Sequence, residues 1–226
     1  MAAFAQKDYG SIQNRVGITE HNDPGMEMSL QAQLFCSSGT FDKAEPLFKA
    51  ALKYWSQHTP VDPEARPRCL NNFGLMYAGQ GKYEQAVPLY RDSLALSGKS
   101  LPPDHNLVVL ATDNLAQAYR AMGKYQDAEP LYKKALALEE KTMVPDDQDH
   151  AITMFNLSLL YLQQKRYAEC EPLMTRSLSV LKTTLGEDNP DYLNVYKYYP
   201  ALLRQTGRTP EADRLEEELV KRLSAH

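Results

Sequence analysis

An internal repeat of constant length constrains this sequence more than any other feature. The segment GKYEQAVPL at 81–89 recurs as GKYQDAEPL at 123–131 and as GTFDKAEPL at 39–47. Two weaker copies are KRYAECEPL at 165–173 and GRTPEADRL at 207–215, so every step is 42 residues without an insertion. A period of this length is typical of stacked supersecondary units, each of which buries its hydrophobic face against its neighbours. The sequence therefore predicts an array of about five equivalent units.

Each unit is predicted to be a pair of α-helices. Apolar residues at helical spacing mark the first helix, as with Leu70, Phe73 and Tyr77 in one unit. A short turn that contains Gly follows, because Gly readily adopts the left-handed conformation that ends a helix. The second helix comes next, and a connector rich in Pro, Asp and Asn leads to the following unit. First helices are expected at roughly 64–79, 106–121, 149–163 and 191–205.

Two series of small residues, each spaced by 42, predict how the helices of a pair cross. The second helices carry Ala44, Ala86, Ala128, Cys170 and Ala212. The first helices carry Ala32, Gly74, Ala116 and Ser158. Helices approach closely only where their side chains are small, so we expect the two series to be buried and to face each other. Cys170 replaces an Ala here, which favours a core role for its thiol over a catalytic one.

Prolines lie inside both kinds of helix. Pro46, Pro88, Pro130 and Pro172 fall near the starts of the second helices, where a missing N–H costs little, so these helices are expected to begin about one turn earlier. Pro200 falls in the middle of the last first helix, where proline is unfavourable. We expect that helix to kink or break.

These residues resemble the tetratricopeptide repeat (TPR) family. One unit carries the family pattern as Phe73-Gly74-Leu75-Met76-Tyr77, Ala86, Tyr90 and Ser93. The next unit carries it as Leu115-Ala116-Gln117-Ala118-Tyr119, Ala128, Tyr132 and Ala135. The period of 42, in place of the ordinary 34, is similar to that of the kinesin light chain class, as are Leu70-Asn71-Asn72 and the connector at 186–190. The resemblance implies an all-α fold: an α-solenoid, a right-handed superhelix of about five helix pairs, with an N-terminal half-repeat helix.

The domain organisation follows from this period. Residues 1–25 are expected to hold the half-repeat helix, within 1–18, and a connector, because Ala2 lies 42 residues before Ala44. The TPR domain is expected at 26–222. Its repeats are predicted at about 26–63, 64–105, 106–148, 149–190 and 191–222. The charged last helix suits the end of a solenoid, which needs a polar outer face.

The resemblance implies that the first helices line the concave face, a groove for a peptide or partner segment. Asn72, Asn114 and Asn156 recur there at the 42-residue spacing. A carboxamide both donates and accepts hydrogen bonds, so it can hold a peptide backbone without reading its sequence. Because helix interiors disfavour Asn, we predict that these three bind a partner; the alternative is a bond to the neighbouring helix or to the residue's own turn.

Further partner-binding residues are predicted on the same face: Arg68, Arg120, Phe155, Lys197, Tyr198 and Arg204. The cations among them make the groove locally basic, which favours a ligand with acidic side chains or a free C-terminal carboxylate. The family's carboxylate clamp uses Asn at a position that is Leu75, Gln117 or Leu159 in this chain. That clamp is therefore not expected.

Composition excludes several other classes of protein. The formal net charge is 25 − 29 = −4, which argues against binding nucleic acid through bulk positive charge. No run of about 20 apolar residues predicts a membrane span. Three cysteines at unequal spacing form neither a disulfide framework nor a zinc motif, and no catalytic motif occurs. We expect no enzyme activity, no catalytic residue, no metal and no cofactor.

The sequence predicts a non-catalytic scaffold that binds a protein or peptide. Two alternatives stay open: a self-assembling module that pairs through its C-terminal unit or N-terminal helix, and an accessory domain of a larger enzyme or regulator. Free thiols favour a reducing, cytoplasmic location. A periplasmic or secreted location is the alternative if Ala3-Phe4-Ala5 is the remnant of a signal-peptide cleavage site.

Overall fold

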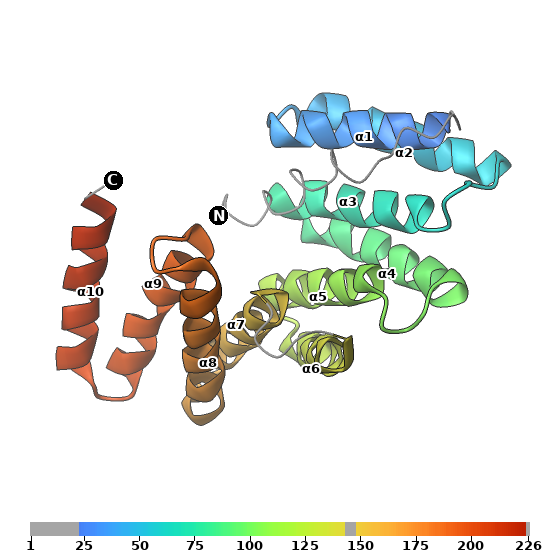
Figure 1. The fold of residues 1–226 in the computed structure, drawn as a ribbon. Coiled ribbons are helices and arrows are strands. Elements are labelled where there is room, and N and C mark those ends of the chain that lie inside the picture. The colour runs from blue at the N-terminus through green and yellow to red at the C-terminus, as the bar shows by residue number, and fades with distance from the viewer. Residues whose placement is uncertain (1–22, 143–147, 225–226) are drawn as a thin grey trace. The chain divides into compact units, whose positions relative to one another are not determined.

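The computed structural model describes residues 23–142 and 148–224, and this part of the chain consists of ten α-helices without a strand (Figure 1). The helices are α1 (Pro24–Ser37), α2 (Phe41–Gln57), α3 (Ala65–Gly79), α4 (Tyr83–Ser100), α5 (Asn106–Ala121), α6 (Tyr125–Thr142), α7 (Gln148–Gln163), α8 (Tyr167–Leu185), α9 (Pro190–Gln205) and α10 (Thr209–Ser224). The all-α prediction is confirmed, and the odd-numbered helices are the predicted first helices. The half-repeat helix predicted within 1–18 lies outside the described residues.

The turn inside each helix pair has the same backbone geometry throughout. Gly39, Gly81, Gly123 and Gly207 have positive φ values of 72° to 82°. The remaining copy has Lys165 at the same register, with φ of 60°. The sequence period is therefore a period in backbone conformation as well.

The chain divides into two compact units, residues 1–124 and 125–226. In the first unit each helix from α1 to α5 packs against the next, and the first helices α1, α3 and α5 also contact one another in turn. Its core contains a stack in which the rings of Phe48 and Phe73 lie 5.2 Å apart and those of Phe73 and Tyr77 lie 4.9 Å apart. Asp23 caps α1, and its carboxylate also accepts a hydrogen bond from the Trp55 indole at 3.1 Å.

The second unit repeats this pattern from α6 to α10, with an additional contact between α7 and α9. Met174, Leu181, Leu202 and Leu203 are completely buried. Its core also includes Glu139 of α6, whose carboxylate accepts a hydrogen bond from Thr153 of α7 at 2.9 Å.

Both series of small residues are buried as predicted, since every alanine in them and Ser158 are fully enclosed. The close neighbour of Gly74, however, is the large ring of Tyr90 on α4. A Cβ at Gly74 would lie only 2.6 Å from that ring. α3 and α4 therefore cross closely because the large Tyr90 ring fills the space left by the small Gly74.

The prolines near the helix starts lie as expected, whereas Pro200 does not break its helix. The helices α2, α4, α6 and α8 begin five residues before their prolines, close to the predicted single turn. Of the predicted kink or break at Pro200, the break does not occur, since α9 runs uninterrupted from Pro190 to Gln205. Proline removes one backbone N–H, and the packed neighbours of this buried residue hold the helix together across it.

Polar contacts also join successive repeats, at a recurring separation of 37 residues. The guanidinium of Arg166 donates a hydrogen bond to Glu129 at 2.6 Å, and Arg208 donates in the same way to Glu171. At the equivalent position α4 has Val87 in place of Glu, and there Arg91 donates to the hydroxyl of Tyr119. The register therefore fixes the place of these contacts, whereas the partners differ between junctions.

Candidate partner-binding surface

The three predicted asparagines lie at different depths. Asn72 on α3 is half-buried, Asn114 on α5 is 7% exposed, and Asn156 on α7 is completely buried. The Nδ2 atom of Asn114 donates a hydrogen bond of 3.0 Å to Oδ1 of Asn71, which links α5 to α3. Of the three, Asn72 is the residue whose side chain a partner could reach without a rearrangement of the helices.

Sequence reasoning did not assign a role to Asn71. This side chain is completely buried, and its Nδ2 atom has no hydrogen-bond partner in the described part of the chain. The pair of amides joins two neighbouring repeats, which is the alternative considered for the asparagine series. The signal was present in the motif Leu70-Asn71-Asn72, but the sequence did not indicate which of the two amides points inward.

The predicted cations are partly neutralised by nearby carboxylates. Arg68 pairs with Glu64 one turn earlier, and its guanidinium lies 3.5 Å from the carboxylate of Asp62. Arg204 pairs with Glu216 and with Asp213 on α10, the latter at 2.8 Å. The carboxylate of Glu216, and to a smaller extent that of Asp213, raises the pKa of Arg204. The positive charge of the predicted groove is therefore smaller than the count of arginines indicates.

Arg120 and Lys197 are the remaining predicted cations. Arg120 is half-buried in the last turn of α5. Lys197 on α9 is exposed and forms no ion pair within the described ranges. In the second unit, Lys197 is thus the predicted cation that is available to a carboxylate from outside.

The two predicted aromatic residues contact each other. Phe155 of α7 is 1% exposed, and its ring centroid lies 5.6 Å from that of Tyr198 on α9, at an interplanar angle of 57°. Tyr198 is 39% exposed, and it occupies the asparagine register, 42 residues after Asn156. The buried Phe155 ring therefore supports an exposed aromatic ring on a first helix.

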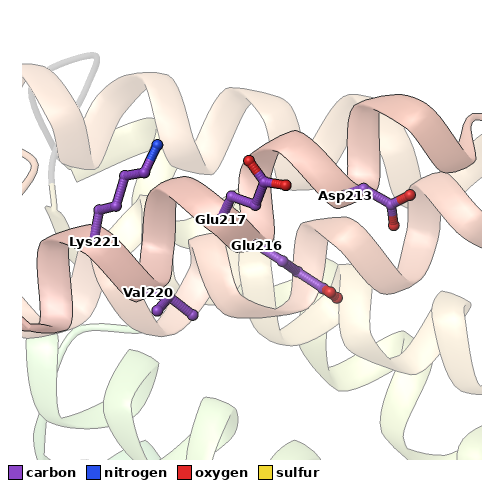
Figure 2. Close-up of a pocket in the computed structure, with 5 residues that line it drawn as sticks. All are labelled: Asp213, Glu216, Glu217, Val220 and Lys221. Carbon is purple, nitrogen blue, oxygen red and sulfur yellow. The ribbon is translucent and has the colours of Figure 1, made fainter.

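A second surface feature lies on α10 and escaped sequence reasoning. A shallow hollow there is lined by Asp213, Glu216, Glu217, Val220 and Lys221 (Figure 2). Val220 is 66% exposed. The charged sequence of this helix predicted a polar terminal face, and it gave no reason to expect an exposed aliphatic side chain there.

The cysteines are poor candidates for nucleophiles. Burial raises the pKa of the Cys69 and Cys170 thiols to about 12 and that of Cys36 to about 11. A thiol with such a pKa is protonated at neutral pH, and only the thiolate is a strong nucleophile or metal ligand. Within the described residues no group of three or more His, Cys, Asp or Glu side chains is arranged to hold a metal ion. None of the described helices combines the length and the apolar character that crossing a bilayer requires.

Several solved structures have the same fold as this chain. The kinesin light chain TPR-like repeats of Podosopora anserina superpose with a TM-score of 0.74 at 19% identity, covering 91% of this chain and 98% of that one. BtubC (BKLC) of P. vanneervenii gives a TM-score of 0.75 at 22% identity, covering 88% of this chain and 79% of that one. Aspartyl phosphate phosphatase F of Bacillus subtilis gives 0.71 at 13% identity, covering 89% of this chain and 52% of that one. At these identities the likeness concerns the fold, and no curated protein sequence matches the chain significantly.

The family model "Tetratricopeptide repeat" matches the sequence in four overlapping segments, at 26–99, 66–141, 107–169 and 149–225. Together these segments include all ten helices apart from the first two residues of α1. Kinesin light chain-like proteins are among its structural neighbours. Repeats of this family form scaffolds for protein–protein interaction. The chain therefore belongs to the tetratricopeptide repeat family.

Proposed function

We propose that this protein is a non-catalytic scaffold that binds a peptide, or an extended segment of a partner protein, along the faces of its first helices. The observation that carries this proposal is the exposed ring of Tyr198, held against buried Phe155 on the first helices of the second unit. Exposed aromatic side chains supply much of the binding energy at protein interfaces. The TPR family membership supports the same class of function.

The proposed mechanism is binding to a preformed surface. Packing of Phe155 restricts Tyr198 before a partner arrives, so little conformational entropy is lost on binding. In the first unit, half-buried Asn72 is proposed to bond a partner backbone, and the hydrogen bond between Asn114 and Asn71 holds the neighbouring helices in place. The buried Asn156 is proposed to position α7 in the same indirect way.

The charge of the partner is part of the proposal. Lys197 is exposed and forms no ion pair among the described residues, so a carboxylate of the partner would pair with it. Arg68, Arg120 and Arg204 contribute a weaker positive potential, because two of them already pair with acidic side chains. Binding to an acidic segment would weaken as the salt concentration rises.

The experiment begins with selection of ligands from a random peptide display library on the wild-type protein. Affinities of the selected peptides are then measured by fluorescence polarisation for wild type and for Tyr198→Ala. We expect the variant to bind at least about tenfold more weakly, the size of effect that loss of an interface aromatic typically has. Lys197→Ala should weaken binding less and should reduce its salt dependence.

The matched control is Tyr83→Ala, which removes a half-buried tyrosine from a second helix of the first unit. This variant should retain the affinity of the wild type, and circular dichroism should show that every variant is folded. Unchanged affinity of Tyr198→Ala for every selected peptide would refute the proposed surface.

A further inference from the structure

The outer face of α10 is exposed where the equivalent face of the earlier second helices is covered. Val220 belongs to a register that also contains Leu52, Leu94, Leu136 and Leu178. Each of these four leucines is half-buried, whereas Val220 is 66% exposed. The position therefore carries an aliphatic side chain in all five copies, and it lacks cover on α10.

Most of the charged side chains around Val220 form ion pairs within the second unit. Arg204 pairs with Asp213 and Glu216, and Arg222 pairs with Glu218. Glu217 and Lys221 form no ion pair among the described residues, although they lie one helical turn apart and both line the hollow (Figure 2). One carboxylate and one ammonium group thus lie near an exposed aliphatic side chain.

This arrangement is complementary to a second copy of itself. Residues 217, 220 and 221 share one face of the helix, because side chains three and four positions apart are neighbours. When two such faces meet antiparallel about a two-fold axis near residue 219, each acid lies opposite the base of the other copy. The two aliphatic side chains then meet close to the axis. A parallel or head-to-tail arrangement would not match both charges at once, and a self-complementary patch of this kind suits an isologous dimer.

We propose that two copies of this chain associate through α10, with Val220 of both copies at the two-fold axis and with Glu217 of each copy paired to Lys221 of the other. A single helix face is small compared with the interfaces of stable dimers, so the association is weak. It concerns the outer side of the last helix pair and does not depend on the peptide-binding function proposed above.

Sedimentation velocity of the whole chain tests this proposal between about 10 μM and about 1 mM, the range of a weak, small interface. The wild type should show a sedimentation coefficient that rises with concentration at low salt. Lys221→Glu and Glu217→Lys should each weaken the association by about fivefold or more, because two attractive pairs become repulsive. The double variant Glu217→Lys/Lys221→Glu should recover the wild-type association, since it exchanges the two charges.

Arg214→Glu is the matched control, because it makes the same change in charge on the same helix at an exposed residue that does not line the hollow. It should associate like the wild type, and Val220→Ser should associate more weakly. The proposal is overturned if the wild type is a monomer throughout the range. It is equally overturned if Arg214→Glu weakens association as much as Lys221→Glu, or if the double variant does not recover.

Discussion

At the scale of single residues, the turn register makes a direct prediction about Lys165. Its backbone has φ of 60° where the other four copies have Gly, and a side chain in the left-handed region costs about 1 kcal/mol. Lys165→Gly should therefore raise the free energy of unfolding by about 1 kcal/mol, as measured by urea denaturation. The reverse change, Gly123→Lys, should lower it by a similar amount. A loss of stability in Lys165→Gly would show that the lysine side chain makes a stabilising contact that outweighs the strain.

The crossing of α3 and α4 makes a second prediction at this scale. Gly74→Ala would place a methyl group 2.6 Å from the Tyr90 ring, so the fully packed ring must move. We expect the free energy of unfolding, measured by thermal denaturation, to fall by about 1–3 kcal/mol, the usual cost of overpacking a core. Gly79→Ala on the same helix is the control, because its Cβ would meet no atom within 4 Å. This control should be neutral or slightly stabilising, since Ala favours helix more than Gly does.

The burial of individual residues was predictable from the sequence only where a register repeats. The alanines of the small-residue series, for example, are buried in every copy. The pairing of Arg204 with Glu216 was not predictable, since Phe48, Tyr90, Tyr132 and Met174 occupy the register of Glu216 in the other units. A repeat period places a side chain on its helix, but its contacts depend on which residues the neighbouring helices present.

At the scale of helices, the contact between Glu129 of α6 and Arg166 at the start of α8 should make stability depend on pH. The hydrogen bond from Arg166, with smaller contributions from Lys133 and Tyr161, lowers the pKa of Glu129 to about 2. An unfolded Glu titrates near 4.3, so the stabilisation is complete above that pH and is lost as the pH falls toward about 2. Since the pair is partly exposed, we expect a contribution of about 1 kcal/mol.

Chemical denaturation of wild type and Glu129→Gln between pH 7 and pH 2 measures this effect. The wild type should be more stable by about 1 kcal/mol at pH 7, and the difference should shrink through the acidic range. Asp92→Asn, which removes an exposed carboxylate that forms no ion pair among the described residues, should have almost no effect at any pH in this range. A constant difference between wild type and Glu129→Gln would contradict the assigned pKa.

The helices themselves were largely predictable, because turn glycines, connector prolines and apolar spacing agree in every copy. The continuity of α9 through Pro200 could not be predicted from the sequence. The local preference of proline argues for a break, whereas the packing of buried residues on both sides of it, among them Val195 and Leu202, favours a single helix. Tertiary packing decides the outcome here, and sequence periodicity does not measure its strength.

At the scale of the whole molecule, we propose that the first helices bind a partner while the second helices support them. The resemblance to the tetratricopeptide repeat family implied this division of roles, and the family match agrees with the class of function. Which of the asparagines is accessible could not be predicted, because burial separates Asn72 from Asn156 although they share a register.

The most direct test is nuclear magnetic resonance of the isotope-labelled protein titrated with a peptide selected on the wild type. The account predicts that the shifted side-chain and amide signals cluster on first helices, including those of Tyr198 and Lys197 on α9. Shifts confined to the second helices α4 and α8, with the signals of α3, α5, α7 and α9 unchanged, would contradict it.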